Sequence, residues 1–142
     1  MEYTDSDNNG EEGSLIYIID DCGLQKLLLK KTLNQRGFRV RAFTNGFNLI
    51  KALDEECPDL IISDIDMPNI DGMDLIREVK SRQNCNDIPF WFLSSFDITD
   101  VKEKARNLGA EKFINKPFND KELIADVRSR LQSLPDVAGS MA

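Results

Sequence analysis

The chain has 142 residues, of which 41% are hydrophobic and 30% charged, as expected for one globular domain rather than a disordered chain. Its net charge of -7 argues against direct binding to nucleic acid, because phosphate backbones attract basic surfaces. The absence of histidine excludes an imidazole base, a phosphohistidine or a histidine metal ligand from the chain's own chemistry.

The polar segment 1–13 is expected to form a flexible acidic arm, followed by a domain over 14–134 and a tail or linker start over 135–142. Short, nearly continuous apolar runs in the domain are typical of buried strands. These runs are Leu15–Ile19, Phe38–Phe43, Leu60–Ser63, Pro89–Leu93 and Lys112–Ile114.

Apolar residues with helical spacing follow each of these runs. They are Leu24, Leu27 and Leu28 with Thr32; Phe47, Ile50 and Leu53; Leu75, Ile76 and Val79; Ile98, Val101, Ala105 and Leu108; and Leu123, Ile124, Val127, Leu131 and Leu134. Gly37 and Gly109 are expected to end the first and fourth helices, and Asn119 to cap the last one.

Five β–α units in alternation predict an α/β fold, with a doubly wound parallel sheet between two layers of helices. Right-handed crossovers favour the strand order 2-1-3-4-5, which is the flavodoxin-like, three-layer (βα)5 sandwich. Ligands of such sheets bind beyond the carboxyl ends of the strands, near the point where the winding reverses.

Polar residues follow four of the five predicted strands: Asp20 and Asp21 the first, Asp64 the third, Ser94 the fourth and Lys116 the fifth. Clustered carboxylates take up protons or bind a hard cation such as Mg²⁺. An ammonium group and a hydroxyl can hold phosphoryl oxygens, and a carboxylate nucleophile would form an acyl phosphate. Each residue alone could be a helix cap or a loop residue, but together they favour phosphoryl transfer.

Four motifs resemble those of the receiver domains of bacterial two-component response regulators, which have the CheY-like fold. They are Asp20-Asp21, Asp64-Ile-Asp-Met-Pro-Asn-Ile-Asp-Gly72, Leu93-Ser94-Ser95 and Lys116-Pro117-Phe118. The resemblance covers residues 15–134. It implies a phosphorelay in which a sensor histidine kinase or a histidine phosphotransfer protein donates a phosphoryl group to Asp64. The domain would catalyse only its own phosphorylation and dephosphorylation.

For the metal, the resemblance implies that Asp21 and Asp64 bind Mg²⁺ directly, Asp20 through a water molecule and Asp66 through its backbone carbonyl. As an additional acidic side chain near Asp64, Asp66 is also hypothesised to change the lifetime of the acyl phosphate.

The resemblance further implies that Lys116 pairs with the phosphoryl group and precedes a cis peptide bond to Pro117. Ser94, usually threonine in the family, and Phe113, usually tyrosine, would form a switch. Phosphorylation would then alter the surface made by the fourth helix, fifth strand and fifth helix, through which a downstream effector that the sequence does not identify would be regulated.

Two other functions fit parts of the sequence. Asp64-Ile-Asp66 after an apolar strand resembles a phosphatase of the haloacid dehalogenase type, but that motif normally opens its domain, whereas two strand units precede it here. A pseudo-receiver that binds partners without phosphorylation is the second alternative. A monomer or a weak homodimer is expected.

No apolar run approaches the length of a membrane span, and the acidic amino terminus is unlike a secretory signal. The three cysteines Cys22, Cys57 and Cys85 are odd in number and lack metal-ligand spacing, which predicts no disulfide framework. We therefore expect a cytoplasmic protein.

Overall fold

Five parallel strands form one sheet in the order β2-β1-β3-β4-β5, as predicted. The computed structural model describes residues 13–65, 72–94 and 99–140, so most of the expected arm lies outside the described residues. The strands are β1 (Leu15–Ile19), β2 (Arg39–Phe43), β3 (Leu60–Asp64), β4 (Phe90–Ser94) and β5 (Ala110–Asn115). The helices are α1 (Gly23–Asn34), α2 (Gly46–Leu53), α3 (Gly72–Lys80), α4 (Thr99–Leu108) and α5 (Asp120–Ser140).

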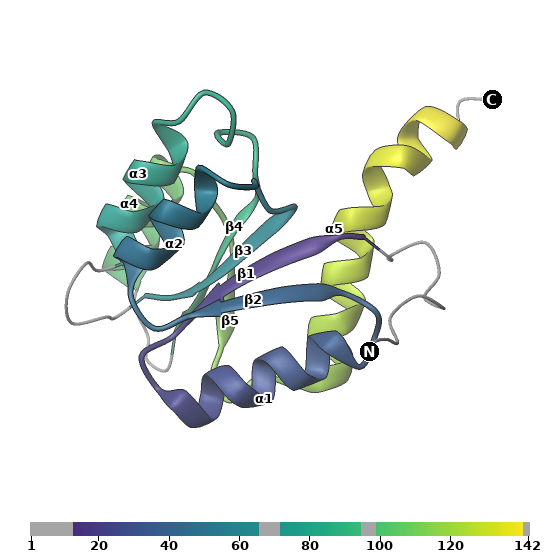
Figure 1. Ribbon diagram of the computed structural model, residues 1–142, viewed down its shortest axis with the longest axis horizontal. Helices are drawn as coiled ribbons and strands as arrows, with labels where there is room; N and C mark the ends of the chain where they lie inside the picture. The colour runs from purple at the N-terminus through teal and green to yellow at the C-terminus, as the bar shows by residue number, and fades with distance from the viewer. Residues whose placement is uncertain (1–12, 66–71, 95–98, 141–142) are drawn as a thin grey trace.

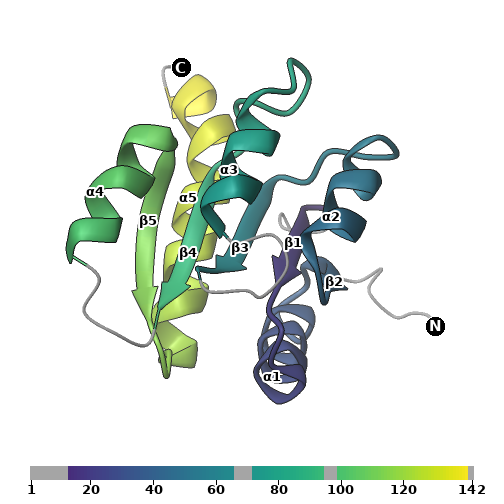
Figure 2. The same ribbon diagram turned by 90° about the vertical axis from the view of Figure 1, so that its left-hand side faces the viewer.

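Helices cover both faces of the sheet, because alternate residues of its central strands point to opposite sides. Tyr17 and Phe92 pack against α2, α3 and α4, while Ile18, Ile62 and Trp91 pack against α1 and α5. Figure 1 and Figure 2 show these two layers around the sheet. Every residue of β1, β3 and β4 is buried, which explains their nearly continuous apolar sequences.

Helix α1 does not face the sheet with the leucines that the sequence spacing predicts to be buried. Leu29 and Leu33 are buried against the sheet, whereas Leu24, Leu27 and Leu28 are 66%, 60% and 50% exposed. Leucines occur on both sides of this helix, so periodicity alone could not select the face that meets the sheet. The exposed leucines leave an apolar surface on α1.

The helix ends follow the sequence prediction closely. Gly37 and Gly109 adopt φ angles of 97° and 116°, in the left-handed region that favours glycine, and they lead from α1 into β2 and from α4 into β5. The Asn119 side chain accepts a 3.0 Å hydrogen bond from the Glu122 amide at the start of α5. Helix α5 continues to Ser140, beyond the domain boundary expected at 134.

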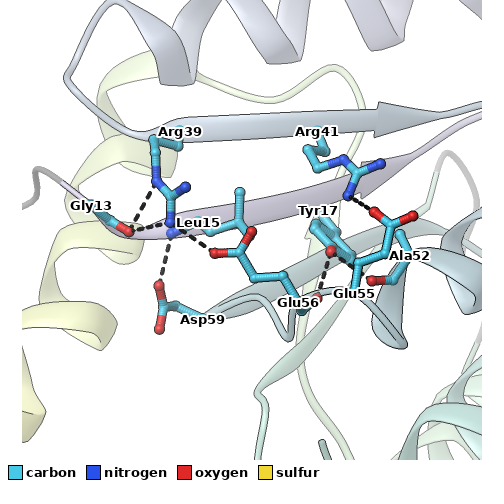
Figure 3. Close-up of polar contacts among 9 residues, drawn as sticks. All are labelled: Gly13, Leu15, Tyr17, Arg39, Arg41, Ala52, Glu55, Glu56 and Asp59. Atoms are coloured by element: carbon cyan, nitrogen blue, oxygen red, sulfur yellow. Dashed lines mark hydrogen bonds and ion pairs between the residues drawn. The ribbon is translucent and has the colours of Figure 1, made fainter.

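Polar contacts tie the amino ends of the strands to the α2–β3 connection (Figure 3). The Tyr17 hydroxyl donates to the carbonyl oxygens of Ala52 and Glu56 at 3.2 and 2.6 Å. The Asp59 carboxylate accepts a 2.7 Å hydrogen bond from the Leu15 amide. Burial raises the pKa of Tyr17, so this hydroxyl stays protonated and can donate. These bonds fix the edge of the sheet opposite to its carboxyl ends.

A disulfide joins Cys57 and Cys85 at this same edge, and the prediction of no disulfide is wrong. The two residues are 28 apart in sequence, and each lies shortly before one of the neighbouring strands β3 and β4. Parallel pairing of these strands brings their Cα atoms to 6.0 Å, within the normal range for a disulfide. Cys22 is exposed and is the free cysteine. None of the helices in the described ranges has the length and apolarity to span a membrane.

Candidate functional site

Parallel pairing brings the carboxyl ends of β1, β3, β4 and β5 to one edge of the sheet. In the β1–β3 ladder Ile19 lies opposite Ser63, so that Asp20 comes next to the last residue of β3, Asp64. In the β4–β5 ladder Ser94 lies opposite Asn115, directly before Lys116. The residues predicted from the four strand ends therefore meet in space.

Three carboxylates form the acidic part of the site. Asp20 and Asp64 are 1% and 6% exposed, Asp21 is exposed, and one carboxylate oxygen from each lies within 4.8 Å of the others. Oδ1 of Asp20 accepts a 2.9 Å hydrogen bond from the Cys22 amide. Oδ2 of Asp20 is also buried, yet it has no hydrogen-bond partner among the described residues.

This arrangement fits a hard divalent cation. A buried carboxylate oxygen without a partner is unfavourable, and like charges held this close repel each other. A cation with oxygen preference, such as Mg²⁺, would remove both penalties while accepting only part of its ligands from the protein. The unpartnered Asp20 oxygen and the two neighbouring carboxylates thus suit the predicted metal.

Lys116 supplies the positive charge of the site. Its Nζ atom lies 3.3 Å from Oδ1 of Asp64, and the two side chains are only 10% and 8% exposed. The Lys116 amide donates a 2.8 Å hydrogen bond to the Ser94 carbonyl, which joins the ends of β4 and β5. The Lys116–Pro117 peptide bond is cis. A largely buried ammonium group thus faces the predicted phosphoacceptor.

Gln25, which the sequence did not single out, is the second partner of this lysine. Its Oε1 atom accepts a 3.1 Å hydrogen bond from Nζ of Lys116. The two residues are 91 apart in sequence, and Gln25 belongs to no motif. Only the approach of α1 to the β5–α5 connection brings them together, so linear spacing contained no sign of this contact.

Ser94 and Phe113 occupy different parts of the site region. Ser94 is 2% exposed and ends β4. Phe113 is half-buried in β5, where its ring stacks on Phe92 with 5.9 Å between centroids. From α4, Lys102 and Arg106 lie 5.7 and 5.4 Å from the Phe113 ring centroid, at cation–π distance. The predicted switch aromatic therefore lies between the sheet and α4. Asp66 and Ser95 fall outside the described residues, and the expectations for them stay predictions.

The start of α3 approaches the site closely. The Gly72 amide donates a 3.2 Å hydrogen bond to the carbonyl of Ile65, which follows Asp64. A Cβ atom at Gly72 would lie 2.6 Å from Cε1 of Phe92 and 3.1 Å from the Ile65 backbone. Only glycine fits here without displacing a neighbour.

The sequences of known proteins that resemble this chain belong to one family. The model of the response regulator receiver domain matches residues 16–128. The transcriptional regulatory proteins GltR of Pseudomonas aeruginosa and CssR of Bacillus subtilis are 32% and 35% identical, over 84% and 82% of the chain. The chain spans about half the length of each, 50% and 51%.

Solved structures give the same result. The signal receiver domain of a signal transduction histidine kinase from Syntrophus aciditrophicus has 31% identity and a TM-score of 0.78, covering 86% of this chain and 92% of that one. The receiver domain of a sensor histidine kinase from Pseudomonas aeruginosa, which holds magnesium in its active site cleft, shares the fold with a TM-score of 0.77 at 22% identity, covering 84% of this chain and 98% of that one. The chain belongs to the response regulator receiver domain family.

Proposed function

We propose that Asp64 is the phosphoacceptor of this receiver domain and takes its phosphoryl group from a phosphohistidine that lies outside these 142 residues. The observation that carries the proposal is the buried Lys116–Asp64 pair beside the acidic cluster. A nucleophile, a cation and positioned donors are the components that phosphoryl transfer requires. The donor histidine lies outside the given sequence, because these 142 residues contain no histidine. A sensor histidine kinase or a histidine phosphotransfer protein is the donor that this chemistry favours.

Asp20, Asp21 and Asp64 would hold Mg²⁺, supported by the unpartnered Asp20 oxygen. When bound, the ion would neutralise part of the carboxylate charge and polarise a phosphoryl oxygen. The backbone carbonyl of Asp66 remains the proposed further ligand, as the family resemblance implies.

The residues of the chain have distinct roles in the proposed transfer. An oxygen of Asp64 attacks phosphorus in line, forming an O–P bond while the N–P bond of the phosphohistidine breaks and the released imidazole takes up a proton. Lys116 moves its pairing from the carboxylate to a phosphoryl oxygen. The hydroxyl of Ser94 donates to another phosphoryl oxygen. The product is an acyl phosphate on Asp64.

The exposed leucines of α1 provide a surface for the donor protein. Leu24, Leu27 and Leu28 lie on the helix that also carries Gln25, the partner of Lys116. A donor must bring its histidine to a largely buried Asp64, so it must cover the surface beside the site, where apolar contacts would hold it. Leu27→Glu is expected to slow transfer from the donor protein and to leave phosphorylation by acetyl phosphate unchanged. Equal slowing with both donors would contradict this docking.

The central test is phosphorylation by acetyl phosphate with and without Mg²⁺, measured by phosphate-affinity electrophoresis and ³¹P NMR. Asp64→Asn should abolish the modification. Asp126→Asn is the matched control, since Asp126 pairs with Lys112 on the surface. If the native chain neither binds Mg²⁺ nor becomes phosphorylated, it is a pseudo-receiver. Sustained multiple turnover of a phosphate ester would instead indicate a phosphatase.

Phosphorylation is proposed to change the surface of α4, β5 and α5. Ser94 would move toward the phosphoryl group, and Phe113 would turn inward from its position beside Lys102 and Arg106. Phe113→Ala should then weaken the dependence of effector binding on phosphorylation. Phe47→Ala, at an exposed phenylalanine, is the control. If effector binding by Phe113→Ala responds to phosphorylation as in the native chain, the aromatic has no part in the switch.

The lifetime of the acyl phosphate is proposed to depend on Asp66. Equal dephosphorylation rates of the native chain and Asp66→Asn would rule this out. We also propose that the domain works in the cytoplasm, where disulfides are rare. The Cys57–Cys85 disulfide of the structure would then be reduced in the cell, and alkylation after acid quenching would detect the two thiols.

A further inference from the structure

The Lys116 ammonium has acceptors on two sides, and only one of them belongs to the reacting group. Asp64 Oδ1 lies 3.3 Å from Nζ, and the amide oxygen of Gln25 lies 3.1 Å from the same atom. The carboxylate comes from the end of β3, whereas the amide comes from the first turn of α1, on the opposite face of the sheet from α4. The lysine is therefore held between a charged partner and a neutral one.

The hydrogen bond from Lys116 to the neutral Gln25 amide can persist when the charged partner, Asp64, becomes phosphorylated. Once Asp64 carries a phosphoryl group, the negative charge moves outward to the phosphoryl oxygens, and Nζ must follow it. A lysine on a four-carbon chain has many rotamers, so a fixed second acceptor limits the directions that its ammonium can take. Because an amide has no charge, Gln25 restrains Lys116 without competing electrostatically with the phosphoryl group.

The surroundings of Gln25 agree with a restraining role. It lines a groove of about 210 Å³ between α1 and the start of the β5–α5 connection, together with Pro117 and Phe118, the two residues after Lys116. Gln25 is half-buried, and the groove leaves room for a side chain of similar length. Its amide can therefore be removed without opening the core.

We infer that Gln25 is a positioning residue for phosphorylation, which holds the Lys116 ammonium toward the phosphoryl group throughout the transfer. This inference rests on the proposed function, in which Lys116 pairs with that group. It gives α1 a part in the chemistry through Lys116, the residue to which the Gln25 side chain is hydrogen-bonded.

The test compares Gln25→Met, which keeps the length of the side chain and removes the acceptor, with Gln35→Met at the residue that caps the carboxyl end of the same helix. Gln35 is exposed at the other end of α1, so this control makes the same chemical change away from the site. Gln25→Met is expected to slow phosphorylation by acetyl phosphate roughly three- to tenfold, the range that a typical net protein hydrogen bond corresponds to. Thermal stability and Mg²⁺ affinity should match those of Gln35→Met.

Two further measurements separate positioning from a merely structural effect. The ¹³Cε and ¹⁵Nζ resonances of Lys116 should shift in Gln25→Met and not in Gln35→Met. In a double-mutant cycle, adding Gln25→Met to Lys116→Met should cause no further loss, because Gln25 acts through the lysine. Native phosphorylation rates in Gln25→Met, or full additivity in the cycle, would overturn the inference.

Failure of the proposed function has a different signature. If Lys116→Met is phosphorylated as fast as the native chain, Lys116 has no role and the underlying proposal fails. If Lys116→Met is impaired while Gln25→Met behaves as native, the role of Lys116 stands and only the positioning role of Gln25 is refuted.

Discussion

Replacing Gly72 by alanine tests how tightly α3 is packed beside the site. The new Cβ would lie 2.6 Å from Cε1 of Phe92, closer than van der Waals contact allows, and 3.1 Å from the backbone of Ile65. Phe92 is fully buried between its neighbours, so its ring cannot swing into solvent. Overpacking of this kind destabilises a protein by about 1–3 kcal/mol. Alanine recovers at most about 1 kcal/mol of helix propensity, and less at the first helical residue.

The cost of overpacking therefore exceeds the gain in helix propensity. Gly72→Ala should lower the free energy of unfolding by roughly 1–2 kcal/mol. Gly23→Ala is the matched control: Gly23 also begins a helix, and a Cβ there would meet nothing within 4 Å. It should raise the stability by about 0.5 kcal/mol through the unfolded state. Urea denaturation, followed by circular dichroism and Trp91 fluorescence, measures both. A Gly72→Ala chain as stable as the native one would refute this account of the packing.

Three other changes can be measured in the same way. Reducing the Cys57–Cys85 disulfide, which closes a 28-residue loop, should destabilise the oxidised chain by about 3.5 kcal/mol, and the Cys57→Ser/Cys85→Ser variant should no longer respond to reductant. Partial burial of the Glu111 side chain opposes its ionisation, but hydrogen bonds led by the one from Arg130 outweigh this effect and lower the pKa of the carboxyl below its usual 4.5. The ionised form of Glu111 therefore stabilises the fold above about pH 4.5, and this stabilisation is lost as the pH falls through the lowered pKa. Glu111→Gln should have a lower free energy of unfolding than the native chain at pH 7, and the two values should become equal in acid. Tyr17→Phe removes a hydroxyl that donates to two carbonyl groups and should cost about 1–2 kcal/mol; an unchanged urea midpoint would show that these bonds contribute nothing.

The sheet and the centre of the site could be predicted because a simple rule connects them. In a parallel sheet all strands end at the same edge, so Asp20, Asp64 and Lys116 were brought together by topology alone. The start of β5 was placed at Lys112 instead of Ala110, because β5 lies at the edge of the sheet and includes the exposed Glu111. Half-exposed strands lack the continuous apolar pattern that identified the central ones.

Contacts between elements could not be predicted in this way. The pairing of Cys57 with Cys85 depends on which strands become neighbours and on where each connection begins. The hydrogen bond from Lys116 to Gln25 depends on the rotation of α1 about its axis. That rotation could not be chosen from the leucine spacing, because leucines occur on both sides of the helix. Long-range side-chain geometry was therefore the limit of the sequence prediction.

The strand order also has a consequence for the chain during its synthesis. Asp20 and Asp64 leave the ribosome well before Lys116, which follows the last strand of the sheet. A nascent chain that lacks β5 therefore contains the acidic residues without the ammonium group that faces them. If the proposed chemistry needs both, an unfinished or truncated chain cannot carry the phosphoryl signal. Placing the lysine after the final strand would make completion of the fold a precondition for signalling.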